Sequence, residues 1–306
     1  MKYIPSINIE SGIHQEFQYI VTPNAKEVLG NIVESFHSGI HSFTIIGNYG
    51  TGKSSFIIGL EKDLENGTSN LVTNRNVFGD VTAFEFMNIV GDYASLSDVL
   101  SAKLDIANFA DSKNIFEALS NKYKECKKDG KFLFIVIDEF GKILEYAANN
   151  NPEKELYFLQ KLAEFVNHPS RNVILLTTLH QNFGSYAYKL NDAQRNEWLK
   201  IKGRYKEIVF VEPVEQLMFL ASEQLNGNLA TMKENAKTNF IQLYSLAKKN
   251  NILSESLSLE TVKKLYPLDP IAASCLTFSI QRYGQNERSL FSFLAATGRG
   301  SLRDYE

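Results

Sequence analysis

The chain has 306 residues, of which 44% are hydrophobic and 22% are charged, and its formal net charge is −3. These values are typical of a globular protein whose core fills one large domain or two smaller ones. The slightly acidic balance excludes a general attraction to phosphate backbones, so composition gives no argument for nucleic-acid binding. Such binding stays possible only through a local patch or another chain.

Cysteine usage and hydropathy bear on the compartment. Cys126 and Cys275 lie far apart, with neither metal-ligand spacing nor the pattern of a disulfide framework. No run of about 18 apolar residues predicts a membrane span, and the charged N-terminal segment has no apolar signal region. We therefore expect a cytoplasmic protein without a membrane partner.

Strands and helices alternate along the first two thirds of the sequence. The predicted strands are 43–46, 83–89, 132–137, 172–179 and 207–211. The predicted helices are 23–38, 54–64, 96–108, 112–128 and 155–166. Short apolar runs separated by helices of period 3.6 predict a parallel sheet with helices on both faces, which is a three-layer α/β core.

After residue 211 the pattern becomes helical throughout. Helices are predicted at 213–225, 231–249, 258–265, 269–282 and 287–296. We therefore predict two domains, an α/β core at 1–211 and a helical lid at 212–306, with the boundary at Glu212-Pro213. Five lysines between residues 122 and 131 are interpreted as a solvated helix end.

Residues 47–54 read Gly-Asn-Tyr-Gly-Thr-Gly-Lys-Ser, the complete G-x-x-x-x-G-K-[ST] pattern of a phosphate-binding loop. A strand precedes it and a helix follows, so glycines can turn loop amides toward phosphate oxygens at the positive end of the helix. Lys53 is expected to reach the β and γ phosphates and Ser54 to bind Mg²⁺. A plain glycine turn is the alternative. The predicted nucleotide-binding residues of this segment are Asn48, Tyr49, Gly50, Thr51, Gly52, Lys53, Ser54 and Ser55.

The apolar run 132–137 ends in Asp138 and Glu139. A buried strand that ends in two acids can place Asp138 beside the Mg²⁺ bound by Ser54 and leave Glu139 to polarise a water in line with the γ phosphate. Alone, such a run is a weak signal, since many strands end at acidic turns. Its place downstream of a phosphate loop favours the catalytic interpretation, so the sequence predicts Mg²⁺-dependent ATP hydrolysis.

Three further polar positions are candidates for catalysis. His180 follows the strand 172–179, where it, Gln181 or a threonine can orient the attacking water; a histidine satisfied by backbone is the alternative. Arg204 precedes the last strand and can project toward a neighbouring subunit's γ phosphate, or be a plain surface arginine. Arg288 can fold back onto nucleotide, or pair with Glu287 at a helix start.

Together these motifs resemble the AAA+ superfamily of three-layer, ASCE-type P-loop ATPases. The matching positions are Walker A at 47–54, Walker B at 134–139, the sensor 1 strand ending near His180, the arginine-finger motif at 203–205 and a sensor 2 arginine at Arg288. The resemblance implies ATP and Mg²⁺ as cofactors, nucleotide between core and lid, adenine contacts from Ile20 and Val21, and a homo-oligomer. Sensor 1 is commonly Asn or Thr, so His180 departs from the pattern.

Several segments are also similar to the large P-loop ATPases of bacterial anti-phage and restriction-type systems, including BREX and STAND-like defence proteins. They are 19–23, 47–56, 177–181, 266–270 and 285–293. This resemblance implies that the chain is the N-terminal ATPase module of a longer protein, with partner defence proteins and a role in sensing or processing foreign nucleic acid.

Two other functions fit the same motifs. A nucleotide-dependent switch or scaffold would hydrolyse ATP very slowly and recruit partners while the lid is ordered. A small-molecule kinase would need an acceptor pocket under a mobile arginine-bearing lid, and Glu139 together with a helical C-terminal region favours water activation instead.

Overall fold

The computed structural model describes residues 8–10, 19–67, 71–81, 83–106, 112–211, 214–231, 233–255, 257–283, 287–295 and 302. The chain divides into two compact units. The first comprises Ile7–Asn48 with Lys53–Phe210, and the second contains Tyr49–Gly52 and Val211–Glu306. The functional division into core and lid stays a prediction.

Five strands form one parallel sheet in the first unit. They are β1 (Ser42–Ile46), β2 (Ala83–Val90), β3 (Lys131–Asp138), β4 (Val173–Leu179) and β5 (Lys206–Val209), in the order β2-β3-β4-β1-β5. All five predicted strands are confirmed, although β5 ends two residues earlier than expected. Strand β4 lies between β1, which leads into the phosphate loop, and β3, which ends in the acidic pair. The chain therefore has the predicted α/β P-loop NTPase fold.

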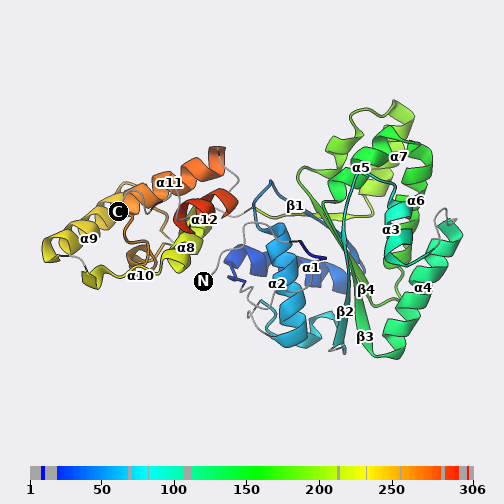
Figure 1. Ribbon diagram of the computed structural model, residues 1–306, viewed down its shortest axis with the longest axis horizontal. Helices are drawn as coiled ribbons and strands as arrows, with labels where there is room; N and C mark the ends of the chain where they lie inside the picture. Colours follow the sequence, from blue (N-terminus) through cyan, green and yellow to red (C-terminus); the bar gives the residue numbers. More distant parts are fainter. Residues whose placement is uncertain are drawn as a thin grey trace. The chain divides into compact units, whose positions relative to one another are not determined.

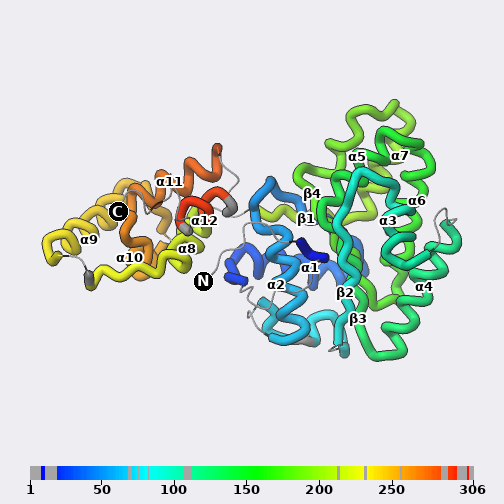
Figure 2. Tube along the Cα trace, viewed as in Figure 1, coloured from blue at the N-terminus to red at the C-terminus, as the bar shows by residue number. Residues whose placement is uncertain are grey.

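Helices cover both faces of this sheet (Figures 1 and 2). One face carries α1 (Pro23–His37) and α2 (Lys53–Asn66), and the other carries α3 (Leu96–Lys103), α4 (Ser112–Lys128), α5 (Phe140–Asn149), α6 (Pro152–Val166) and α7 (Asp192–Lys202). Strand β3 shows how the sequence builds these layers, because successive side chains of a strand point to opposite faces. Its even-numbered apolar residues, such as Phe134, pack with the buried side chains of α1 and α2, a set called the α1/α2 cluster. Its odd-numbered apolar residues, such as Ile135, pack with the buried side chains of the helices on the other face.

Two helices of the first unit were not predicted, and one predicted helix is too long. Helix α5 begins directly after Glu139, a single left-handed residue that makes no side-chain capping bond. Helix α7 buries only Trp198 and Ile201, but its capping box between Asn191 and Gln194 is a signal that the sequence does carry. The helix predicted at 96–108 ends at Lys103, and positions 107 and 108 lie outside the described residues.

The second unit is helical in all its regular elements. These are α8 (Val214–Leu225), α9 (Glu234–Lys249), α10 (Leu259–Lys263), α11 (Pro270–Tyr283) and α12 (Glu287–Ala295), as predicted, and the described residues after 211 contain no strand. Short 3-10 turns occur at Arg75–Phe78, Phe183–Ala187 and Leu229–Thr231. Within the described ranges, no helix combines the length and apolar character that crossing a bilayer requires.

Candidate nucleotide-binding site

The phosphate loop leaves the carboxyl end of β1 beside the end of β4. The amide of Gly47 donates to the carbonyl of Leu179 at 3.1 Å. Gly50 and Gly52 have φ values of 73° and 84°, a left-handed backbone that favours glycine. Helix α2 then begins at Lys53, and the first amides of a helix have no partner within it. The segment therefore combines a turning backbone with the first amides of a helix, which is the chemistry of an anion site.

Lys53 is buried at the start of α2, with 6% of its surface exposed. Its ammonium donates to the carbonyls of Gly47 at 2.5 Å and Asn48 at 2.9 Å. Burial lowers the pKa of Lys53 to about 8, although the charges of Asp138 and Glu139 act in the opposite direction. A desolvated cation gains strongly from an added anion, so Lys53 is suited to bind phosphate.

The lowered pKa of Lys53 predicts a pH dependence of nucleotide affinity. Below pH 8 the ammonium is charged, so affinity is expected to stay constant between pH 6.5 and 7.5. Above pH 8 binding must first take up a proton, so affinity should fall by up to about tenfold per pH unit toward pH 10. The fluorescence of an ATP analogue titrated from pH 6.5 to 10 measures this. In Lys53→Arg the guanidinium stays charged, and the decline should disappear; a decline that persists contradicts the assignment.

Asp138 at the end of β3 meets Ser54 at the start of α2. Ser54 Oγ donates to Asp138 Oδ2 at 2.6 Å, and Asp138 is buried. A hydroxyl and a carboxylate oxygen are the hard ligands that Mg²⁺ prefers, and Mg²⁺ usually keeps several waters while it binds one or two protein groups and phosphate. The described residues hold no group of three or more His, Cys, Asp or Glu that forms a metal cage. The Ser54 and Asp138 pair therefore fits Mg²⁺ bound together with nucleotide.

Glu139 is the single residue between β3 and α5. Its backbone is left-handed, with φ 53° and ψ 34°, a conformation that costs a non-glycine residue about 1–3 kcal/mol. The side chain is 39% exposed and Oε2 lies 2.6 Å from Lys142 Nζ. Unlike the buried Asp138, Glu139 is accessible to water, as a residue that activates a water molecule must be.

His180 follows β4 and contacts the loop. Its Nδ1 lies 3.5 Å from Lys53 Nζ. Burial and the Lys53 charge lower the pKa of His180 to about 4, against the opposite effects of Glu139, Asp138 and a hydrogen bond with the Gly47 backbone. The imidazole is therefore neutral at pH 7, and it can exchange hydrogen bonds with phosphate or water without adding a second buried cation beside Lys53.

Gly91, which directly follows β2, was missed in the sequence. Its amide donates to the Asp138 carbonyl at 2.7 Å. A Cβ at this position would lie 2.6 Å from the Glu139 carbonyl oxygen, far inside van der Waals contact. Only glycine lets the end of β2 approach the acidic pair this closely. A glycine immediately after a predicted strand was the available signal.

The remaining predicted nucleotide contacts belong to the segment before α1, to the loop, to α2 and to α12. Ile20 and Val21 are half-buried before α1, and Val21 packs against the α1/α2 cluster. In the loop, Asn48 and Tyr49 are exposed, Thr51 is buried, and Ser55 is half-buried in α2. Only the backbone of Arg288, in α12, belongs to the described part of the structure. The adenine role of Ile20 and Val21 and the sensor role of Arg288 stay predictions.

Arg204 lies at the opposite edge of the sheet from the phosphate loop. It precedes β5, which runs parallel to β1, and its carbonyl accepts from Ser42 Oγ at the start of β1 at 2.6 Å. The five residues of β1 separate it from the loop by about 16 Å. Its guanidinium lies 3.4 Å from Glu164 Oε1. Arg204 is therefore remote from the phosphate loop of its own chain.

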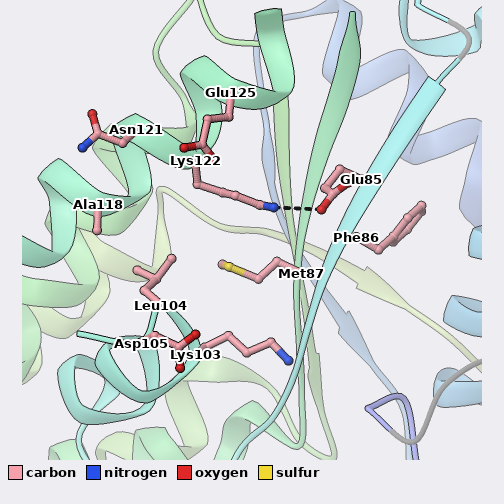
Figure 3. Close-up of a pocket in the computed structure, with 10 residues that line it drawn as sticks. All are labelled: Glu85, Phe86, Met87, Lys103, Leu104, Asp105, Ala118, Asn121, Lys122 and Glu125. Atoms are coloured by element: carbon pink, nitrogen blue, oxygen red, sulfur yellow. Dashed lines mark hydrogen bonds and ion pairs between the residues drawn. The ribbon is translucent and has the colours of Figure 1, made fainter. Parts of the chain in front are cut away.

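A separate pocket of about 490 Å³ lies beside the middle of β2, between α3 and α4 (Figure 3). Glu85 on β2 ion-pairs with Lys122 at 2.8 Å and Lys131 at 3.0 Å. Their hydrogen bonds lower the pKa of Glu85, and the bond to Glu85 raises that of Lys122. Two of the five clustered lysines thus join α4 and β3 to the edge strand, which differs from the expected solvated helix end.

Comparisons with known proteins give likenesses among solved structures only. No family model and no curated protein matches the chain. The Aeropyrum pernix ORC2 protein in ADPNP–ADP complexes is 11% identical, over 84% of this chain and 71% of that one, with a TM-score of 0.44. Caenorhabditis elegans PCH-2 is 14% identical, over 93% of this chain and 65% of that one, with a TM-score of 0.42. Domain III of the Thermotoga maritima replication initiation protein DnaA is 13% identical, over 85% of this chain and 99% of that one, with a TM-score of 0.37.

Proposed function

We propose that this chain is an Mg²⁺-dependent ATPase of the AAA+ type that uses hydrolysis to drive a conformational change. The observation that carries the proposal is the contact between Ser54 Oγ and Asp138 Oδ2 at 2.6 Å, beside a buried Lys53. This contact joins the phosphate loop to the acidic strand end, although the two residues lie 84 positions apart in the sequence. The fold explains why the loop and the acidic pair meet, because parallel strands bring their carboxyl ends to one edge of the sheet.

Each residue has a distinct task in the proposed reaction. Lys53 and the loop amides would bind the phosphates, and Ser54 and Asp138 would hold Mg²⁺, which when bound would neutralise phosphate charge. Glu139 accepts a proton from the attacking water, since its carboxylate is half-exposed at this edge. His180, neutral beside Lys53, orients that water or a γ-phosphate oxygen.

Steady-state phosphate release from the purified chain tests the proposal against the alternative of a slow switch. An ATPase releases many phosphates per chain, and the release stops when Mg²⁺ is chelated. A switch releases about one phosphate or less per bound nucleotide. In a switch, ATP orders the helical unit and ADP does not. Release that continues without Mg²⁺ would contradict the assignment of Ser54 and Asp138.

Arg204 is proposed to act on the nucleotide of a neighbouring copy of this chain. Its distance from its own loop favours action in trans, and such arginines contribute about 10³ to 10⁵ in rate. We expect a larger mass with a slowly hydrolysed ATP analogue than without nucleotide, measured by light scattering. In Arg204→Ala we expect assembly to persist while turnover falls. Arg195→Ala, which also removes an arginine, is the control and should keep the parent turnover. A strict monomer under both conditions would exclude this role.

The proposal of a defence role rests on sequence segments alone. The similarity of 19–23, 47–56, 177–181, 266–270 and 285–293 to anti-phage ATPases supports a module of a bacterial defence protein with partner proteins. The proposed ATPase activity does not depend on this defence role.

A further inference from the structure

Thr178 in β4 makes two hydrogen bonds to the acidic pair, and it is 1% exposed. Its hydroxyl donates to Asp138 Oδ1 at 2.5 Å and accepts the backbone N–H of Glu139 at 3.0 Å. A threonine hydroxyl has one donor and two acceptor sites, so it can make both bonds at once. One buried side chain thus contacts the proposed metal ligand and the proposed catalytic residue.

The order of the strands explains this contact. Strand β4 pairs with β3, and Thr177 is opposite Ile137 in the register, so Thr178 lies beside Asp138. Even-numbered residues of both strands face α2, as Ile174 and Phe134 do. Thr178 and Asp138 therefore point to the side of the sheet on which α2 begins with Lys53 and Ser54.

We propose that Thr178 is a positioning residue that holds Asp138 and Glu139 in their working geometry. Thr178 and the Glu139 amide both hydrogen-bond to Oδ1 of Asp138, which leaves Oδ2 directed at Ser54 and the Mg²⁺ site. The bond to the Glu139 amide also stabilises the left-handed turn that presents the Glu139 carboxylate. Without the hydroxyl, the Asp138 carboxylate loses a fixed partner. This inference rests on the proposed ATPase function.

Thr177 supplies a matched control on the same strand. It is fully buried, and its hydroxyl donates to the Phe43 carbonyl at 3.1 Å and bonds with Thr44 Oγ1 at 2.9 Å. These bonds join β4 to β1 and do not involve the acidic pair. Thr177→Val should therefore lower stability as the loss of any buried threonine hydroxyl does, and it should leave the hydrogen bonds of Asp138 intact.

The experiment compares Thr178→Val, Thr178→Ser and Thr177→Val in the full chain. Three quantities are measured: the affinity for a fluorescent ATP analogue as Mg²⁺ is varied, phosphate release at saturating nucleotide, and the thermal unfolding midpoint. In Thr178→Val we expect the Mg²⁺ midpoint to rise and kcat to fall, each by about 10- to 100-fold, as is typical when the partner of a metal ligand is removed. Affinity without Mg²⁺ should stay within about threefold.

The controls decide between positioning and simple stability. Thr178→Ser should restore both values to within about threefold of the parent, and Thr177→Val should change neither while lowering the unfolding midpoint as much as Thr178→Val does. Equal losses in Thr177→Val, no rescue by serine, or an unchanged Mg²⁺ midpoint would overturn the inference. If the parent binds nucleotide without turnover and Thr178→Val still raises the midpoint, hydrolysis fails and the positioning role stands. A parent that binds no nucleotide overturns both.

Discussion

Replacing Lys53 with alanine is expected to weaken ATP binding by about a hundredfold or more, which corresponds to about 2.7 kcal/mol. The reason is the position of the ammonium, which is buried within the loop and desolvated enough for its pKa to fall to about 8. An anion beside it replaces lost hydration with a charge-assisted hydrogen bond. Equilibrium binding of a fluorescent ATP analogue measures the loss.

The same burial separates loss of binding from loss of the fold. A lysine whose pKa is lowered by desolvation destabilises the folded state in its charged form. Removal of that charge should therefore leave the thermal midpoint of Lys53→Ala at or above that of the parent at pH 7. Lys124→Ala, which removes an exposed lysine of α4, serves as the control and should bind ATP normally. Normal binding by Lys53→Ala would contradict the assignment of the loop.

The parts of the site that could be predicted are those encoded by neighbouring residues. The loop at 47–54 and the acids at 138–139 each follow an apolar strand, and that local pattern was sufficient to assign both. Contacts between strands were different. The bonds of Thr178 to Asp138 and of Gly91 to the acidic pair depend on β4 and β2 flanking β3, and sequence order alone does not give the order of strands in a sheet.

The two helices that were missed fail for different physical reasons. Helix α5 starts without a cap, since Glu139 turns the chain in one left-handed residue and has no side-chain capping bond. Helix α7 is largely polar and buries only two side chains, so its hydrophobic periodicity is weak. Its N-terminal cap at Asn191 could have been recognised in the sequence. The position of Arg204 before a strand was predicted from the sequence, but only the parallel pairing of β5 with β1 places it far from its own loop.

Replacing Glu139 with glutamine is expected to reduce turnover by about 10²- to 10⁴-fold while ATP affinity changes by less than about threefold. Glutamine keeps the size of the side chain and can still accept a hydrogen bond from Lys142, but it cannot take a proton from water. Backbone contacts explain why binding should persist. The Glu139 amide, which bonds to Thr178 and Asp138, is unchanged by the substitution, so Asp138 keeps its direction toward Ser54.

Rapid-quench measurement of a single turnover, together with equilibrium binding, separates chemistry from product release in Glu139→Gln. Glu145→Gln, which alters an acid within α5, is the matched control and should keep the parent rate. If Glu139→Gln retained turnover, the proton acceptor would be another group, and neutral His180 is the neighbouring candidate. Loss of ATP binding in Glu139→Gln would instead assign the carboxylate to the Mg²⁺ site, because binding would then depend on its negative charge beside Asp138.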